Sequence, residues 1–201
     1  MNRRSLLATL SASVAVPGLL AAPSAFAQEE YPKQLVRWVV PYPAGGGTDN
    51  LARAIAENMR VGLGQQLIID NRPGASTNIG AELVARSKPD GYTIMSADNA
   101  VLAFNEHLFK QLRYSPEKDF SYIGAIGKFP LALVVTPDFP AKTFAEFMAY
   151  VKANPGKVSY ASAGNGSPHH LAMELFKNRT GLQLTHIPYK GAAPAMQDLM
   201  G

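Results

Sequence analysis

Apolar runs typical of β-strands alternate along the chain with stretches whose apolar residues fall at helical spacing. The first run, Leu35–Val40, precedes a loop rich in Pro and Gly, after which Leu51, Ile55 and Met59 predict one face of a helix that ends at Gly62–Gly64. The order recurs, and the predicted strands are Leu35–Val40, Leu67–Ile69, Tyr92–Ser96, Leu131–Val135, Val158–Ser162 and His186–Tyr189. Strands that alternate with helices at these lengths predict an α/β fold with largely parallel sheets.

Several helix ends carry local signals. Thr143 and Glu146 have capping-box spacing and open a predicted helix that runs to Lys152. Ser167 is placed to cap another helix, with Pro168 as its first residue. The turn sequences Lys88–Gly91 and Asn154–Gly156 close the helices before them. A last helix is expected after residues 190–193.

Five loops of small and polar residues connect a predicted strand to the helix that follows it: 43–50, 71–77, 97–99, 163–167 and 190–193. In an open parallel sheet such loops lie on the edge where ligands bind. Each helix start also offers free backbone N–H groups and a partial positive charge, which suit an anion. One such loop would be weak evidence. Five loops at the same position of the repeating strand–helix unit predict a cleft lined by amides and hydroxyls that binds a small carboxylate or phosphate.

Composition narrows the class of protein. Hydrophobic residues make up 47% of the chain and charged residues 17%, a balance that argues against intrinsic disorder. The absence of cysteine excludes a disulfide framework, a thiolate metal site and a cysteine nucleophile. The net charge is +4, yet Lys and Arg are scattered among acidic residues, whereas a nucleic-acid interface needs a clustered basic face. Nucleic acid is therefore not an expected partner.

Residues 1–27 have the pattern of a secretory signal peptide. Arg3 and Arg4 precede an apolar stretch at 6–20, and Ala25–Ala27 is a small-x-small cleavage site. The stretch is interrupted by polar residues and is short for the ~20 apolar residues of a membrane-spanning helix. Cleavage removes two arginines and no acid, which lowers the charge from +4 to +2. We expect export to the periplasm, and both the Sec and the twin-arginine route remain open.

Other candidate chemistry is poorly supported. Gly45–Gly47 follows a strand, but Asn50 stands where a dinucleotide fingerprint needs its third glycine. His169 and His170 are adjacent and would diverge on a helix, so they are expected to be surface or capping residues rather than metal ligands. No Gly-x-Ser-x-Gly elbow of a serine hydrolase occurs.

Some loop residues have two open interpretations. Asp49, Asp98 and Glu82 could act as acids or bases, although Asp49 and Asp98 are expected to cap helices or fix loops. Arg72 and Lys190 are the basic residues inside the loops, and each could pair with an acidic ligand or lie solvated beside it. Tyr42 lies between two prolines, and its side chain is equally expected to line the cleft or to pack in the interior. The aromatic residues expected in the core are Trp38, Phe144, Phe147 and Phe176.

The loop sequences resemble a known family. Val40–Asp49 (VPYPAGGGTD) and Asp70–Ala75 (DNRPGA) resemble the first two signatures of the Bug receptors, which are extracytoplasmic solute-binding proteins of tripartite tricarboxylate transporters. The resemblance continues in order through Lys88–Tyr92, Lys118–Phe120, Asn154–Gly156, Tyr160–Gly164 and Ile187–Gly191. It covers essentially the whole chain after the predicted signal peptide.

The resemblance implies a periplasmic-binding-protein-like fold of two α/β lobes with the ligand in the cleft between them. It places the first lobe at 28–128, the second at 129–201 and the crossing near 127–131. Family members are longer, and the chain stops at Gly201 on what resembles an unfinished helix. The second lobe and the return crossover are therefore expected to be incomplete.

The resemblance also implies a function. The protein would capture a small carboxylated solute and deliver it to the permease subunits of a tripartite tricarboxylate transporter, as a monomer, with no cofactor, no metal and no enzymatic activity. Loop amides and hydroxyls with bridging waters would hold the ligand. The implied ligand-binding residues are Tyr42, Ala44, Gly45, Gly46, Gly47, Thr48, Asp49, Arg72, Gly74, Ala75, Ser76, Asp98, Asn99, Ser162, Ala163, Gly164, Asn165, Ser167, Tyr189, Lys190 and Gly191. The alternatives are a ligand sensor that signals to a kinase and an exported hydrolase.

Overall fold

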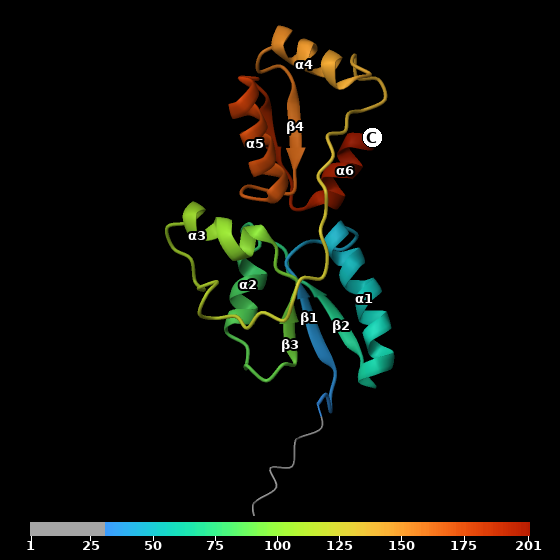
Figure 1. The fold of residues 1–201 in the computed structure, drawn as a ribbon, viewed down its shortest axis with the longest axis vertical. Helices are drawn as coiled ribbons and strands as arrows, with labels where there is room; N and C mark the ends of the chain where they lie inside the picture. Colours follow the sequence, from blue (N-terminus) through green and yellow to red (C-terminus); the bar gives the residue numbers. More distant parts are fainter. Residues whose placement is uncertain (1–30) are drawn as a thin grey trace, which may run out of the picture. The chain divides into compact units, whose positions relative to one another are not determined.

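A computed structural model describes residues 31–201, and strands alternate with helices along this part of the chain (Figure 1). The predicted signal peptide at 1–27 lies outside the described residues. The elements are β1 (Val36–Val40), α1 (Gly47–Leu63), β2 (Leu67–Asn71), α2 (Asn78–Ala85), β3 (Thr93–Met95), the π-helix η1 (Ala100–Phe104), α3 (Asn105–Leu108), α4 (Phe144–Ala153), β4 (Ser159–Ser162), α5 (Pro168–Thr180), β5 (Thr185–Pro188) and α6 (Ala192–Met200). The predicted α/β class is confirmed.

The first three strands form a parallel sheet, the N-terminal sheet, in the order β2-β1-β3. Its central strand β1 is buried because a neighbouring strand lies along each edge and helices α1 and α2 pack against it. Trp38 is aligned with Ile69 of β2 and Ile94 of β3, and its side chain is 4% exposed. Its indole Nε1 donates a hydrogen bond of 2.9 Å to Ser96 Oγ, which satisfies the polar end of a buried ring.

The last two strands form a second parallel sheet, the C-terminal sheet, in which β4 pairs with β5. Tyr160 of β4 is aligned with His186 of β5. A separate core packs here around Phe147 and Val151 of α4, with Leu184 before β5. The two sheets therefore have their own hydrophobic cores.

The predicted helix caps are confirmed. Thr143 Oγ1 accepts a hydrogen bond of 3.2 Å from the Glu146 amide, and the Glu146 carboxylate accepts one of 3.1 Å from the Thr143 amide. Ser167 Oγ accepts a hydrogen bond from the His170 amide at 3.3 Å, and Pro168 is the first residue of α5. Gly64 closes α1 with φ of 64°, a left-handed conformation that glycine adopts without strain.

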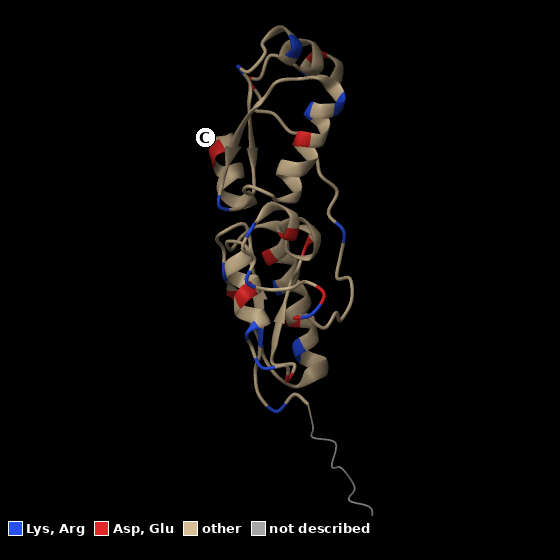
Figure 2. Cartoon of the chain, turned by 90° about the vertical axis from the view of Figure 1, so that its left-hand side faces the viewer, with Lys and Arg blue, Asp and Glu red and all other residues tan. Residues whose placement is uncertain are grey.

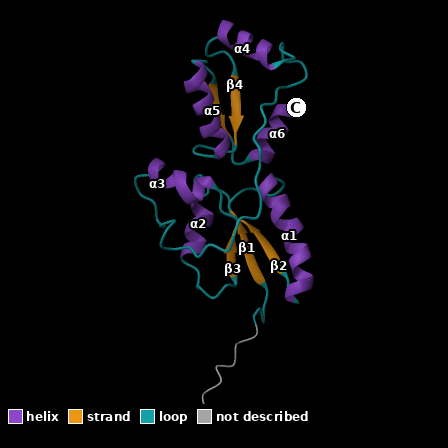
Figure 3. Ribbon diagram, in the orientation of Figure 1, coloured by secondary structure: helices purple, strands orange, loops and turns teal. Residues whose placement is uncertain are grey.

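The predicted strand at Leu131–Val135 is wrong. Residues 120–136 contain no helix or strand, and they lie in the long loop before α4 in Figure 3. A strand needs hydrogen bonds to a neighbour, and residues 131–135 form no backbone hydrogen bond within the described part of the chain. An apolar run supplies the propensity for a strand but not its partner.

Three smaller expectations are corrected. Phe144 is 61% exposed rather than buried in the core, because it is the first residue of α4. Helix α1 begins at Gly47, inside the segment predicted as loop, because small residues fit the first turn of a helix as well as a turn. A helix was expected after the loop 97–99, but not that it begins as the π-helix η1 and continues as the short helix α3. Trp38 and Phe147 are buried as predicted, and Phe176 packs partly buried against the second core.

Figure 2 shows Lys and Arg interspersed with Asp and Glu along the described chain. Between residues 31 and 201 no helix is both long and apolar enough to cross a lipid bilayer.

Candidate functional site

The loops that follow β1, β2, β4 and β5 line one cavity of about 280 Å³. These loops are the ones that the sequence pattern places at the ligand edge of parallel sheets. The lining residues are Pro41, Tyr42, Gly74, Ala75, Ser76, Thr77, Ala100, Ala163, Gly164, Asn165, Ser167, Pro188, Tyr189 and Lys190.

The loop after β2 has an unusual backbone. Gly74 has φ of 125°, and Ala75, Ser76 and Thr77 follow with φ of 45°, 54° and 76°. Three successive non-glycine residues in the left-handed region are costly, on the order of 1–3 kcal/mol each. The amides of these four residues donate no hydrogen bond within the part of the chain that the structure describes. The loop therefore offers a row of backbone donors beside the cavity, at the start of α2.

A buried amide holds this loop in place. The side chain of Asn105 is fully buried, and its Nδ2 lies 2.8 Å from the Ser76 carbonyl and 2.7 Å from Asn78 Oδ1. Tyr114 donates from its hydroxyl to the Val101 carbonyl at 3.2 Å and lies beside the same amide. Sequence reasoning missed Asn105 because it lies 29 residues from Ser76 and belongs to no motif.

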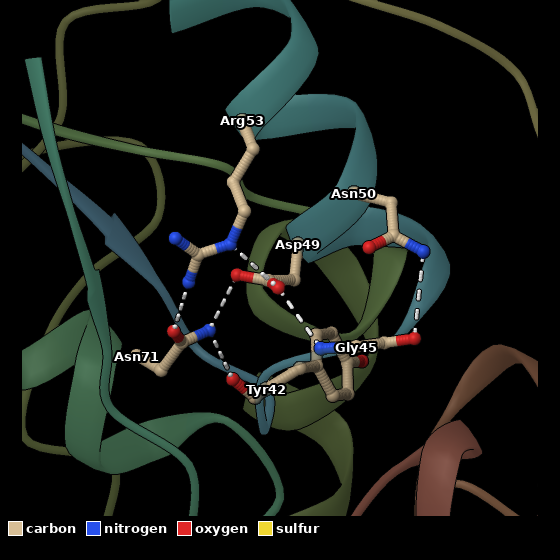
Figure 4. Close-up of polar contacts among 6 residues, drawn as sticks. All are labelled: Tyr42, Gly45, Asp49, Asn50, Arg53 and Asn71. Carbon is tan, nitrogen blue, oxygen red and sulfur yellow. Dashed lines mark hydrogen bonds and ion pairs between the residues drawn. The ribbon is translucent and has the colours of Figure 1, made fainter.

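A network around Asp49 fixes the glycine-rich loop after β1 (Figure 4). The Asp49 carboxylate is buried and accepts hydrogen bonds of 2.9 Å from the Gly45 amide, from Arg53 Nε and from Asn71 Nδ2. Asn71 Nδ2 also donates to the Tyr42 carbonyl at 3.0 Å. The prediction that Asp49 fixes a loop is confirmed, because both oxygens of its carboxylate accept hydrogen bonds from this network.

The environment of Asp49 also fixes its charge. Burial favours the neutral acid, but the hydrogen bonds from Arg53, Gly45 and Asn71 and the positive charge of Arg53 outweigh it. The pKa of the Asp49 carboxyl is therefore lowered. At neutral pH the loop is held by an ionised carboxylate, whose hydrogen bonds are stronger than those of a neutral acceptor.

Tyr42 and Asp98 link the loops after β1 and β3. The Tyr42 hydroxyl donates a hydrogen bond of 2.6 Å to Asp98 Oδ2, while Asp98 Oδ1 accepts from the Ala100 amide at 3.0 Å. Burial, followed by the charge and hydrogen bond of Asp98, raises the pKa of Tyr42. Asp98 thus caps the next helix, as predicted. The Tyr42 side chain lines the cavity and also packs against its surroundings, so both interpretations of this residue hold.

On the other side of the cavity, serine hydroxyls shape the loop after β4. Ser162 is 2% exposed, and its Oγ accepts a hydrogen bond of 3.1 Å from the Gly164 amide. Ser167 caps α5 and also lines the cavity. The cavity therefore has two helix N-termini at its border, that of α2 after Thr77 and that of α5 after Ser167.

Stacked rings support this loop from behind. His170 and His186 stack with ring centroids 4.1 Å apart and an interplanar angle of 9°, and Tyr160 stacks on the other face of His186. The Gly166 amide donates to His170 Nδ1 at 3.0 Å, so His170 is a capping residue as predicted. Residues 31–201 contain no group of three or more His, Cys, Asp or Glu side chains that could hold a metal ion.

Ser162 Oγ also lies 2.7 Å from His186 Nε2, a contact that the sequence did not reveal. A nucleophilic serine needs such a base, which must itself be oriented by a third group. No carboxylate is hydrogen-bonded to His186 among the described residues, and Ser162 is buried and bonded to its own loop. This geometry suits a hydroxyl that holds the loop rather than one that attacks a substrate.

The basic residues of the loops differ in position. Lys190 lines the cavity and is the one charged side chain among its lining residues in the described chain. Arg72 points to Asp70, with Nε 2.9 Å from Oδ1, and does not line the cavity. Gly191 lies against Pro43, and a Cβ atom added to Gly191 would come within 2.6 Å of Pro43 Cδ.

The structure brings only part of the predicted site together. Predicted residues that line the cavity are Tyr42, Gly74, Ala75, Ser76, Ala163, Gly164, Asn165, Ser167, Tyr189 and Lys190. Predicted residues outside its lining are Ala44, Gly45, Gly46, Gly47, Thr48, Asp49, Arg72, Asp98, Asn99, Ser162 and Gly191. Lining residues that the prediction missed are Pro41, Thr77, Ala100 and Pro188. All four are sequence neighbours of predicted residues, so extending each loop by one residue would have found them.

Comparison with known proteins gives consistent matches. A family model described as "Tripartite tricarboxylate transporter family receptor" matches residues 51–201. The chain is 38% identical over 203 residues to a Cupriavidus necator protein described as "UPF0065 protein in gbd 5'region", covering all of this chain and 62% of that protein. It is also 38% identical to Protein BugT of Bordetella pertussis, covering all of this chain and 61% of BugT. The chain thus spans about three fifths of the length of these relatives.

Solved structures agree. The R. palustris protein Rpa4515 with adipate superposes with a TM-score of 0.82 at 39% identity, covering 84% of this chain and 56% of that one. MatC from Rhodopseudomonas palustris with bound malate gives a TM-score of 0.77 at 34% identity, with coverage of 84% and 57%. The periplasmic binding protein BugD gives 0.73 at 40% identity, with coverage of 84% and 56%. The predicted periplasmic-binding-protein-like fold and the resemblance to Bug receptors are confirmed.

Proposed function

Because the chain belongs to the tripartite tricarboxylate transporter receptor family, we propose that it binds a small carboxylated solute in the 280 Å³ cavity. In this proposal the protein is an exported, periplasmic receptor and not an enzyme. The bound solute is then delivered to membrane permease subunits.

The row of unpaired amides at Gly74–Thr77 is the observation that carries the proposal. Backbone donors beside a cavity need an acceptor, which is water in the free protein and a carboxylate oxygen in the complex. The strained backbone of the same residues, held by Asn105, keeps these donors in place before the ligand arrives. The N-termini of α2 and α5 add partial positive charge at the border of the cavity.

The size and charge of the cavity favour a small dicarboxylate. A volume of about 280 Å³ lies just below the range of ~300–1,000 Å³ typical of sites for drug-sized ligands. Lys190 provides one positive side chain, and the remaining positive potential comes from amides. Adipate and malate, the ligands named for two of the structural neighbours, are dicarboxylates.

Calorimetric titration of the chain with adipate and malate, each beside its uncharged diamide, tests the proposal. We expect saturable binding of at least one dicarboxylate and no binding of its diamide, because amides and a lysine select for negative charge. Lys190→Gln should weaken binding about threefold to tenfold, since it removes one partly screened charge. Lys152→Gln, an exposed lysine outside the cavity, is the matched control and should bind as the parent does. Equal binding of acid and diamide would contradict the proposal.

A further inference from the structure

The loop after β4 forms one wall of the proposed ligand site, and two of its backbone amides are held from behind. The Gly164 amide donates to Ser162 Oγ at 3.1 Å, and the Gly166 amide donates to His170 Nδ1 at 3.0 Å. Asn165 lies between them and lines the cavity, and its backbone amide donates no hydrogen bond within the described part of the chain. The two held amides therefore fix the position of the one that is free to meet a ligand.

The acceptor for the Gly166 amide is a nitrogen that can be protonated. A backbone N–H donates to His170 Nδ1 only while this nitrogen carries no proton, so the proton of the neutral ring is on Nε2. When the imidazole takes up a second proton, Nδ1 becomes a donor that faces another donor, and the hydrogen bond is lost. Histidine is the side chain that ordinarily makes this change between pH 5 and pH 8.

Gly166 is poorly placed to replace this acceptor with water. The residue is buried, and a Cβ atom added to it would come within 2.6 Å of Leu108 Cδ1 of α3. A buried N–H group without an acceptor is costly, because it has lost its hydrogen bonds to water and gained none in return. The loop therefore has to move when His170 is protonated, so that the Gly166 amide reaches solvent.

His186, the second histidine of the stack, responds differently. Its Nε2 lies 2.7 Å from Ser162 Oγ, which also lies 3.2 Å from the Gly164 carbonyl. With His186 protonated, Nε2 donates to Ser162 Oγ, and the hydroxyl proton is directed to the Gly164 carbonyl. The Gly164 amide keeps its acceptor in both states. Protonation of His170 thus removes an anchor of the loop, whereas protonation of His186 does not.

The charges that face the two stacked rings come from α5. Tyr160 stacks on His186 and donates to Glu174 at 2.6 Å, and Glu174 is also paired with Lys177 at 2.7 Å. Glu174 favours and Lys177 opposes a proton on His186. No carboxylate is hydrogen-bonded to His170 among the residues that the structure describes, so no ion pair locks this ring in its charged form.

Charged and titratable groups on the other surrounding elements have partners of their own. These pairs are Asp98 with Tyr42, Glu106 with His107, and Asp198 with Tyr189. The charge of Asp98 also acts on His169, and Lys190 lines the cavity. The state of the Gly166 anchor therefore depends on the His170 ring and on the groups stacked behind it.

We propose that His170 is a positioning residue of the ligand site, and that its protonation loosens the loop after β4 so that the protein holds its carboxylate less tightly as the pH falls below neutrality. This inference rests on the proposed function, because it requires the cavity to bind the ligand. Loss of one hydrogen bond of ordinary strength corresponds to about threefold to tenfold weaker binding. The new positive charge attracts an anion, but the ring is partly exposed and lies behind the loop, so solvent and salt screen this attraction.

Hydrogen exchange of the Gly166 amide in the ligand-free chain tests the anchor directly. We expect its protection, corrected for the intrinsic rate, to fall about tenfold between pH 8 and pH 5.5. His170→Asn places an oxygen near the position of Nδ1 and cannot be protonated there, so it should keep the protection at both pH values. His107→Asn, the same change at an exposed histidine of α3, is the matched control and should behave as the parent does.

Calorimetric titration with malate at the same two pH values tests the consequence for binding. Malate itself takes up a proton near the lower pH, so the three proteins are compared at equal pH. From pH 8 to pH 5.5 the parent and His107→Asn should lose about threefold to tenfold more affinity than His170→Asn.

The outcomes separate this inference from the proposed function. Protection of the Gly166 amide that does not change with pH in the parent would overturn the inference, as would an equal loss of malate affinity in the parent and His170→Asn. Failure of both malate and adipate to bind at either pH would contradict the proposed function. The exchange of the Gly166 amide would even then decide whether His170 anchors the loop in a pH-dependent way.

Discussion

Removal of the Asp49 carboxylate should release the glycine-rich loop after β1. Asp49 is 1% exposed and accepts hydrogen bonds from Gly45, Asn71 and Arg53. The first two donors are sheltered, and each bond to a charged acceptor is worth about 1.5–3 kcal/mol. The Arg53 side chain is 50% exposed, so its ion pair adds only about 0.5 kcal/mol. Asp49→Ala should therefore lower the free energy of unfolding by about 3 kcal/mol, after allowance for water reaching the freed donors.

Urea denaturation of the chain measures this loss. For a protein of this size a loss of about 3 kcal/mol corresponds to a fall of about 6–12 °C in melting temperature. Glu57→Gln is the matched control, because it removes an ion pair with Arg60 on the exposed face of the same helix, and it should leave the midpoint unchanged. A loss below 1 kcal/mol for Asp49→Ala, or an equal loss for both variants, would refute the reasoning.

The pH dependence of Asp49 provides a second readout. Since the folded-state pKa of Asp49 is lowered, its contribution is present above the unfolded value of about 3.9 and is lost as the pH falls through the folded value. Asp49→Asn cannot ionise, so its free energy of unfolding should decline less than that of the parent between pH 5 and pH 3. Parallel curves would show that Asp49 does not contribute through its charge.

Three further changes should have distinct effects. Asn105→Ala should cost about 2–3 kcal/mol in urea denaturation, because it removes the fully buried side chain that donates to the Ser76 carbonyl and to Asn78 Oδ1. A loss under 0.5 kcal/mol would contradict the proposed support of the loop. Gly191→Ala should lower the melting temperature, because Gly191 has φ of 145° and the added Cβ would come 2.6 Å from Pro43 Cδ. An unchanged melting temperature would show that residue 191 does not pack tightly against Pro43. Burial and then the charge of His170 lower the pKa of His186, so the melting temperature should fall as the pH drops below about 6.5. His186→Gln should make the melting temperature less dependent on pH, and an unchanged dependence would contradict this role of His186.

Local signals explain what the sequence predicts well. The caps at Thr143 and Ser167 depend on residues at most three positions apart, and both are present as predicted. The alternation of strands and helices and the loops at one sheet edge follow from the same short-range patterns. The predicted boundaries of the two lobes stay a prediction.

Long-range contacts explain what the sequence does not reveal. Asn105 and the Ser162–His186 contact join residues more than twenty positions apart, and neither has a motif. The left-handed turn at Ala75–Thr77 lacks the glycines that mark such turns, since only Gly74 precedes it. The apolar run at 131–135 is strand-like in composition, but its conformation depends on a neighbour that composition does not specify.

The burial of Trp38 makes the protein convenient to observe optically. It is the only tryptophan of the chain, so selective excitation at the red edge of the absorption band reports a single indole in the N-terminal sheet. Its emission should be blue-shifted and should change when Ser96 ceases to accept its hydrogen bond. The eight tyrosines are spread over both sheets, so comparing the tryptophan signal with far-UV circular dichroism shows whether the N-terminal sheet melts together with the rest of the molecule, without any label.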